Sequence, residues 1–416
     1  MGPIVAGAAY GAAMSRQGVL GADGRRLQRS SALAGIGDGV VATALPLLAA
    51  GVTRDPLSVA AVVAAQHIAW AVVAMLGPAL ASDADQRTVL GLATSLRAAA
   101  AAVIGILVMT GGEVLALLMA AALAVGLGEA LTDGGEQATE PLLAGASGGS
   151  PPRSVLRRNG MVGLALVGMP LGGLVYELAA GLAFLVAMGL FALAALAALS
   201  LRAQVMAGGR ASPGLNPSGL PPLASGTATV ATAACLSTAA SSAVLGVLVL
   251  FALDDLGLGA PAFGLLLAGL AAAAAAGGFA SPALGQLVGL RGGVVVALTA
   301  AAVGYMAAGL LGDPVTPIPA MVGLGLASFA GMVASVLLRA LIHSAAGRVV
   351  EGPALSAFHA RVWATIPAGA LAGGLIARAT DVSGALLAAG AASALGAVAA
   401  LAIRSPALAG AARKIG

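Results

Sequence analysis

The sequence predicts an all-α integral membrane protein whose twelve transmembrane helices form two bundles of six. The first observation is composition: 60% of the 416 residues are hydrophobic and 9% are charged, whereas soluble domains carry about 25% charged residues. The second is that the apolar residues gather in runs of about 20, the length that spans a bilayer as a helix. The third is that basic and acidic residues fall in alternate breaks between these runs.

The apolar runs and their breaks place the individual spans. The first six are expected at 32–52, 57–81, 88–110, 114–138, 158–177 and 180–201. Six more are expected at 224–252, 260–287, 292–312, 316–343, 354–377 and 382–403. The division gives a cytoplasmic extension at 1–30, bundles at 31–202 and 223–404, a Gly- and Pro-rich linker at 203–222 and a tail at 405–416. The N-terminus lacks the basic residues that precede a signal-peptide core, so we interpret it as a loose extension, with Met14 as an alternative start.

The charged residues orient these spans. With the N-terminus in the cytoplasm, the basic residues of the loops fall on the cytoplasmic side, apart from Arg54 and Arg378. The opposite side receives the acidic residues Asp55, Glu113, Glu177, Asp254, Asp255, Asp313 and Asp381. A wrong number of spans would scramble this asymmetry, so both termini are expected in the cytoplasm. The bias toward alanine, glycine and arginine suggests a GC-rich bacterial genome, and we therefore expect a bacterial inner-membrane protein.

Several functional classes lack the residues they need. Cys235 is the only cysteine and the three histidines are dispersed, so neither an internal disulfide nor a metal site is expected. A Walker-type phosphate loop requires a lysine, and the only lysine is Lys414 near the C-terminus. The basic residues are scattered in short clusters, which argues against nucleic acid. We expect no enzyme activity and no cofactor. The expected partners are the lipid bilayer, protons and a small-molecule substrate. The protein is expected to be a monomer.

Charged residues inside the spans are the main candidates for function. Asp38 lies within "GIGDGVVATALPLLAA", where a lone carboxylate costs about 2.5–3.5 kcal/mol on insertion scales. Arg97 lies within the third span. In the fourth span, Glu129 and Asp133 begin a series of carboxylates spaced by four, three and four residues, which places them on one helical face. Such a face points to the bundle interior or to a watery mouth, and not to lipid.

Two interpretations of Asp38, Arg97 and Glu129 stay open. In the first, Arg97 neutralises one or both carboxylates and the network holds the bundle together. In the second, a carboxylate takes up and releases a proton as access alternates between the two sides of the membrane. Direct contact with a cationic substrate is a third, smaller possibility. Asp38 is the stronger proton candidate because no basic residue lies within its own predicted span.

Polar residues in two other spans are candidates for a substrate cavity. Gln66, His67 and Trp70 of the second span either line such a cavity or serve ordinary helix packing. The hydroxyl residues of the seventh span are expected to bond to their own backbone more often than to a ligand; they are Ser237, Thr238, Ser241 and Ser242. Six-helix repeats of equal orientation place a substrate site between the halves near the middle of the membrane.

Four stretches carry a resemblance to a known family. They are "GDGVVATALPLLA" in the first span, "GPALASDADQRTVLGLATSLRAA" before and within the third, "GMPLGGLVYE" in the fifth, and "GRVVEGPALSAFHARVWATIPAGALAGGLIA" leading into the eleventh. With them the chain resembles the major facilitator superfamily, most closely the transmembrane secretion effector branch, which includes siderophore and macrolide exporters. The resemblance covers residues 30–404 approximately and implies a fold of two six-helix halves.

The family's loop between the second and third helices clamps the cytoplasmic ends of the halves through charge pairs. The resemblance assigns Gly77, Asp85 and Arg87 to this gate loop. Ser82 and Asp83 depart from the family pattern, because they replace an aspartate and an arginine. The clamp is therefore expected to be weaker in this chain.

The fifth span resembles the antiporter signature of the family. Gly168, Gly172 and Gly173 match it, while the proline is displaced by one position to Pro170. The signature implies efflux by antiport, the activity that confers antibiotic resistance in this branch. The resemblance thus implies proton-coupled export of a small amphipathic molecule such as a drug, siderophore or secondary metabolite. A proton-coupled importer, or a non-transporting membrane partner or sensor, are the alternatives.

Overall fold

The computed structural model describes residues 3–80, 85–112, 115–146, 166–201 and 225–403. Helices make up nearly all of this part of the chain, and their bounds follow. They are α1 (Pro3–Val52), α2 (Pro56–Leu80), α3 (Gln86–Thr110), α4 (Leu115–Ala146), α6 (Ala180–Leu199), α7 (Ser225–Leu250), the π-helical turn η1 (Phe251–Asp255), α8 (Ala260–Leu310), α9 (Ile318–Ala379) and α10 (Val382–Leu401). A shorter apolar helix, Leu166–Leu178, precedes α6. The predicted linker at 203–222 lies outside the described residues.

α8 and α9 each contain two predicted spans. In α8 the break is at Gly289, whose φ of 74° and ψ of 160° fall in a backbone region that glycine alone adopts readily. In α9 the two apolar segments are Ile318–Ile342 and Phe358–Ala379. With α8 counted as two spans and Leu166–Leu178 added, the described helices account for the twelve predicted spans.

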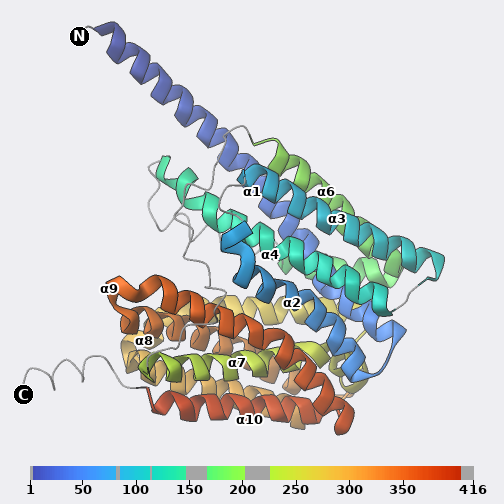
Figure 1. Ribbon diagram of the computed structural model, residues 1–416. Helices are drawn as coiled ribbons and strands as arrows, with labels where there is room; N and C mark the ends of the chain where they lie inside the picture. The colour runs from blue at the N-terminus through green and yellow to red at the C-terminus, as the bar shows by residue number, and fades with distance from the viewer. Residues whose placement is uncertain (1–2, 81–84, 113–114, 147–165, 202–224, 404–416) are drawn as a thin grey trace, which may run out of the picture.

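The N-terminal extension differs from the expectation of a loose segment. α1 begins at Pro3 and continues without interruption into the first span, whose apolar part is Arg25–Val52. Figure 1 shows the first part of this helix projecting beyond the bundle. The segment is rich in alanine, and its only proline stands at the first helical position, where it does not interrupt hydrogen bonding.

The helices form two groups that meet along α2 (Figure 1). We call the described residues up to 201 the N-terminal half, which holds α1–α4, the short helix Leu166–Leu178 and α6. The residues from 225 onward form the C-terminal half, which holds α7, η1 and α8–α10. α2 packs against α4 of its own half and against α7 and α9 of the other half. It is therefore the helix through which a large part of the contact between the halves passes.

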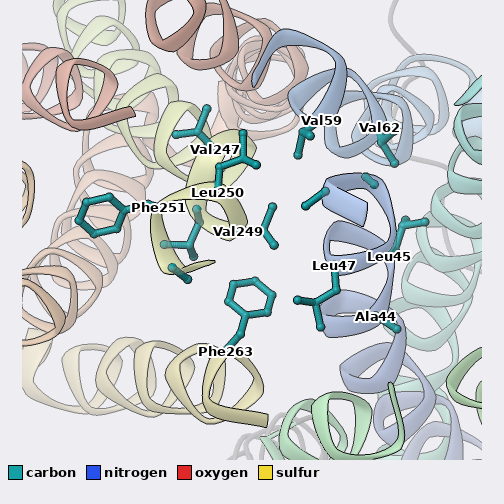
Figure 2. Close-up of a cluster of buried hydrophobic side chains, with 14 of the residues drawn as sticks. Ala44, Leu45, Leu47, Val59, Val62, Val247, Val249, Leu250, Phe251 and Phe263 are labelled. Carbon is teal, nitrogen blue, oxygen red and sulfur yellow. The ribbon is translucent and has the colours of Figure 1, made fainter. Parts of the chain in front are cut away.

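One apolar cluster joins the halves near the ends of α1 and α7. The cluster draws buried side chains from most helices of both halves. Where the halves meet, these side chains come from α1 and α2 on one side and from α7, η1 and α8 on the other. Figure 2 shows Leu47 of α1, Val249 of α7 and Phe263 of α8 pointing toward one another. Because this cluster is continuous across the halves, the two groups are packed together at this end of the molecule.

Backbone contact at glycines holds neighbouring helices at short range. A side chain at Gly126 of α4 would overlap the backbone carbonyl of Gln66 on α2. Between the halves, a side chain at Gly173 would overlap the carbonyl of Ala260 on α8, and one at Gly374 of α9 would overlap Ala60 of α2. Lipid provides little hydrophobic drive for helix association, so such close backbone approach supplies van der Waals contact instead.

Apart from Asp38, Arg97 and Glu129 within the spans, most described charged residues lie near the two ends of the bundle. One end of the bundle, which we call the acidic end, carries Asp55, Glu177, Asp254, Asp313 and Asp381. The opposite end, where α3 begins beside Arg87, we call the basic end. The acidic end also carries Arg54 and Arg378, the two basic residues expected on the side opposite the other arginines.

Substitution of Gly126 by alanine tests the backbone contact between α4 and α2. We expect Gly126→Ala to lower the free energy of unfolding by about 1–3 kcal/mol, because the new methyl group must displace the backbone of Gln66. The matched control is Gly189→Ala in α6, which has open space around it and should be neutral or slightly stabilising through helix propensity. Thermal unfolding in detergent micelles measures both; equal effects at the two sites would contradict the packing argument.

Candidate functional site

An ion pair joins the first and third spans in the middle of the N-terminal half. A terminal nitrogen of the Arg97 guanidinium contacts a carboxylate oxygen of Asp38; Arg97 is almost fully buried, while 29% of the Asp38 side chain is exposed. The guanidinium carbon also lies 4.2 Å from the centre of the Phe191 ring of α6, whose face attracts a cation. A side chain at Gly128 of α4 would overlap Arg97, so glycine makes the space for it. Arg97 of α3 therefore contacts three other helices, α1, α4 and α6.

Glu129 makes a different contact. Its carboxylate accepts a hydrogen bond from the side-chain amide of Gln66, with 3.3 Å between Nε2 and Oε2. Of the two carboxylates considered for Arg97, the structure shows an ion pair with Asp38. The side chain of Asp133 lies outside the described residues. The Asp38–Arg97 pair is compatible with a structural role and with proton uptake, since protonation of Asp38 would weaken its attraction to Arg97.

The three polar residues of α2 point to three different surroundings. Gln66 contacts α4, as described above. His67 lines a cavity in the C-terminal half. Trp70 packs edge-on against Trp363 of α9, with 5.3 Å between the ring centres. These are the two tryptophans of the chain, and their contact joins the halves on the side of the cavity nearer the basic end. Of the three predicted cavity residues, His67 alone lies in the cavity lining.

The cavity has a volume of about 450 Å³ and lies among α7, α8, α9 and α10, with α2 contributing His67. Its apolar lining includes leucines and alanines of α7 and α8. Its polar lining consists of hydroxyl groups from all four helices, among them Ser237, Thr238, Ser242, Tyr305, Ser328 and Ser393. The volume falls within the range of about 300–1,000 Å³ of small-molecule sites.

The hydroxyl residues of α7, for which the sequence favoured bonds to their own backbone, lie in the cavity lining. Ser241 does bond to its own helix, with its hydroxyl donating to the carbonyl of Thr238 at 3.0 Å. It nevertheless lines the cavity with Ser237, Thr238 and Ser242. The spacing of these residues, at i, i+1, i+4 and i+5, marks one helical face and was a usable signal. Tyr305, Ser328, Ser393 and Trp363 were missed, because single hydroxyl or aromatic residues in apolar runs carry no such pattern.

Two exchanged ion pairs connect the halves at the acidic end. Arg54 of the N-terminal half contacts Asp254 of the C-terminal half at 2.9 Å. In the reverse sense, Arg378 of the C-terminal half contacts Asp55 of the N-terminal half at 3.4 Å. Both pairs are solvent-exposed, where each pair adds about 0–1 kcal/mol. They lie at the end where the apolar cluster joins the halves, so the acidic end is closed between them.

Asp55 also caps the start of α2. Its carboxylate accepts hydrogen bonds from the Ser58 hydroxyl at 2.6 Å and the Ser58 backbone N–H at 3.1 Å. The hydroxyl bond is the largest cause that lowers the pKa of Asp55 below its usual value, with the backbone bond and the charge of Arg378 adding to it against a smaller effect of burial. Asp55 therefore stays ionised to lower pH than an ordinary aspartate.

The glycine motif of the fifth span lies between the halves. Gly168 and Gly172 approach the backbone of α1, while Gly173 approaches the start of α8. A side chain at Gly264 of α8 would in turn overlap the backbone at Met169 and approach Pro170. The Thr43 hydroxyl of α1 donates a hydrogen bond to the Met169 carbonyl at 3.0 Å. The motif thus lets one short helix contact both halves at once.

The gate loop is described only in part. Asp85 caps the N-terminus of α3, and its carboxylate accepts a hydrogen bond from the backbone N–H of Arg87 at 3.3 Å. The Arg87 side chain is exposed. Gly77 lies within α2, and its surroundings lie outside the described residues, as do Ser82 and Asp83. The proposed clamp between the halves therefore stays a prediction.

Among the described residues, no group of three His, Cys, Asp or Glu side chains lies close enough together to hold a metal ion. The arrangement has two polar centres instead. One is the charged pair Asp38–Arg97 within the N-terminal half, and the other is the uncharged hydroxyl-lined cavity. Chemically, the first can exchange a proton and the second can bind a small molecule.

Comparison with solved structures identifies the fold. A point mutant of the nucleoside transporter NupG matches with a TM-score of 0.74 and 15% identity over 91% of this chain and 99% of that one. A bacterial homologue of the iron transporter ferroportin in an inward-facing state matches with a TM-score of 0.69 and 17% identity, covering 91% and 97%. A bacterial homologue of the human lysosomal transporter Spinster, in an inward-facing and occupied conformation, matches with a TM-score of 0.69 and 12% identity over 92% of this chain and 97% of that one. The chain therefore has the major facilitator fold.

Sequence comparisons add no closer assignment. No protein-family model matches the chain, and no curated protein matches it. The likeness to the solved structures consequently establishes the architecture and leaves the activity to be argued from the residues.

A double-mutant cycle tests the buried ion pair. Arg97→Met should lower the free energy of unfolding by about 3 kcal/mol or somewhat less, because it leaves the half-buried Asp38 without its cation. The double variant Arg97→Met with Asp38→Ala should recover part of this loss, since it leaves no uncompensated carboxylate. Unfolding in detergent provides the free energies. Strict additivity of the two single effects would show that the pair contributes no coupling.

Acid sensitivity tests the hydrogen bonds of Asp55. Because its folded-state pKa is lowered, its stabilising effect is fully present above the unfolded pKa of about 3.9 and is lost as the pH falls through the lower folded pKa. We expect the melting temperature of the wild type to fall more steeply below about pH 4 than that of Asp55→Asn. Glu177→Gln, at an exposed position of the same end, should keep the wild-type slope. Parallel curves for all three proteins would contradict the assignment.

Proposed function

We propose that this chain is a membrane transporter that moves a small organic molecule by alternating access, coupled to protons. The observation that carries the proposal is the ion pair between Asp38 and Arg97 in the middle of two apolar spans. A charged pair at that depth is costly to retain and is a typical feature of proton relays. The solved structures with the same fold include proteins whose names describe nucleoside, iron and lysosomal transport, which supports transport as the class of activity.

Alternating access requires that the halves separate at one end while they close at the other. The acidic end is closed by the apolar cluster and the exchanged ion pairs of Arg54 and Arg378. The contacts that close it are weak singly, because the ion pairs are exposed and the glycine contacts are short-range. Such an interface separates while each half keeps its own fold. Protonation of Asp38 changes the charge balance inside the N-terminal half, and we propose that this change biases the rearrangement.

We propose export across the bacterial inner membrane as the direction, with the basic end in the cytoplasm. The excess of arginines at that end supports this orientation through the positive-inside rule. The glycine and proline positions of the fifth span, which resemble the antiporter signature, support antiport. Candidate substrates are drugs, siderophores and secondary metabolites. The protein acts as a monomer in this proposal, which the lining of the cavity by helices of one chain supports.

Proton flux in liposomes tests the proposal. Purified protein is reconstituted with an internal pH dye, a proton gradient is imposed, and uncharged hydroxylated compounds, lipophilic cations, antibiotics and siderophores are added one at a time. We expect at least one compound to trigger proton flux, and Asp38→Asn to reduce that flux at least about tenfold, since the variant cannot lose a proton at this position. Substrate movement against the proton gradient identifies antiport, and movement with it identifies symport.

The control is Asp313→Asn, which alters an exposed carboxylate between α8 and α9 and should keep the wild-type flux. Undiminished flux in Asp38→Asn would remove Asp38 from the coupling mechanism. Absence of flux with every compound, in protein that is folded by thermal unfolding, would contradict coupled transport and favour a partner or sensor role.

A further inference from the structure

The cavity differs from a general apolar drug pocket in the kind of polar groups that line it. Hydroxyl groups of α7, α8, α9 and α10 face it, together with the imidazole of His67 from α2. None of the lining residues that the structure describes is a carboxylate, an arginine or a lysine. A hydroxyl group both donates and accepts hydrogen bonds, so such a lining fits partners that also do both.

Most of these hydroxyl groups keep their hydrogen-bonding capacity for a ligand. Ser241 uses its proton on the Thr238 carbonyl, and Ser335 accepts a hydrogen bond from Arg339. Within the described part of the chain, no hydrogen bond to protein occupies the hydroxyls of Ser242, Ser328 or Ser393. Groups of this kind at a cavity wall are satisfied by water or by a bound molecule.

His67 presents a defined face to the cavity. Its Nδ1 lies 2.8 Å from the backbone carbonyl of Val63, one turn earlier in α2. A carbonyl oxygen only accepts, so Nδ1 carries a proton and donates it. In the neutral ring Nε2 is therefore the acceptor that remains for a ligand. The contact to Val63 also fixes the orientation of the ring, which makes His67 a positioned acceptor rather than a mobile one.

The lining discriminates most strongly against charge. Arg339 reaches the edge of the cavity through its contact with Ser335. A charged group bound deeper, among the other lining residues, would lose its hydration without gaining an opposite charge, and that loss is costly in a low-dielectric site. A wholly apolar molecule is penalised less, because serine hydroxyls in a helix can return to their own backbone carbonyls, as Ser241 does. A molecule with several uncharged hydroxyl groups satisfies the lining best.

We propose that the cavity binds an uncharged, polyhydroxylated small molecule of nucleoside or monosaccharide size, with His67 accepting one of its hydroxyl protons through Nε2. The proposal deepens the transport function and rests on it, because it names the substrate class of that activity. Ser242 of α7 and Ser393 of α10, which line the cavity from two helices, contribute further hydrogen bonds. His67 is then a residue of the N-terminal half that contacts a ligand held by the C-terminal half, so the ligand connects the two halves.

Equilibrium binding to the purified chain in detergent tests the proposal. The probes are radiolabelled uridine and glucose, compared with uridine monophosphate and the lipophilic cation tetraphenylphosphonium. We expect uridine or glucose to bind, and any uridine affinity to exceed that of uridine monophosphate at least about tenfold, because no described lining residue is a cation that could pair with the phosphate and Arg339 reaches only the cavity edge. Binding of neither uncharged probe at about 10 mM, or tighter binding of either charged probe, overturns the proposal.

Variants locate the site. With the uncharged probe that binds, His67→Ala and Ser242→Ala should each weaken binding about three- to tenfold through loss of one hydrogen bond. His67→Gln should retain most of the affinity, because its side-chain amide can place an acceptor near the position of Nε2. Ser95→Ala, which removes a hydroxyl bonded within α3, should bind as the wild type does. Unchanged binding in both His67→Ala and Ser242→Ala would place the ligand elsewhere and overturn the assignment.

The binding measurement separates this proposal from the transport proposal. Binding in detergent needs neither a proton gradient nor movement across a bilayer. Uncharged-probe binding without proton flux therefore rejects proton coupling and keeps the substrate class. Proton flux driven by a charged compound, without binding of uridine or glucose, keeps transport and rejects the substrate class.

Discussion

Helices in lipid gain little from burying apolar side chains against one another, so close contact between backbones has to supply much of their attraction. The structure meets this constraint at glycines. Gly126 brings α4 onto α2, and Gly173 and Gly374 bring the halves together at the acidic end. Each of these contacts depends on the absence of a side chain, and backbone contact of this kind is short-ranged. The same feature that holds the halves together therefore also allows them to part.

The polar centre of the N-terminal half depends on the same constraint. Arg97 fits between four helices because Gly128 leaves room beside it, and the Phe191 ring that faces it fits because Gly37 of α1 has no side chain to overlap that ring. The ion pair with Asp38 is then fixed by packing as well as by charge. A larger residue at either glycine would shift the arginine from its carboxylate. The charged pair is thus a consequence of how tightly these helices pack.

The sequence was sufficient for the spans and insufficient for the cavity, for identifiable reasons. Hydropathy and charge are properties of consecutive residues and can be read from the sequence. They predicted a break between residues 287 and 292, where Gly289 lies, and they placed Arg54 and Arg378 on the side opposite the other arginines. The pair of Asp38 and Arg97 was one of the interpretations left open, since few charges lie within the spans. The cavity depends on how α7 is rotated about its axis and on which helices face it. A serine that bonds to its own backbone and one that faces a cavity look the same in sequence, and the contact of Trp70 with Trp363 joins segments far apart in the chain.

The two polar centres lie in different halves, which raises the question of how they communicate. The ion pair of Asp38, at which we propose proton exchange, lies in the N-terminal half, while the cavity proposed to bind the ligand lies mainly in the C-terminal half. α2 contacts α4 and the cavity. Gln66 bonds to Glu129 of α4, whose neighbour Gly128 packs against Arg97. His67, next to Gln66, faces the cavity. Neighbouring residues on a helix point about 100° apart, so a small rotation of α2 changes both contacts together. α2 is thus a structural element shared by both sites, and physical coupling between two sites requires such an element with two arrangements.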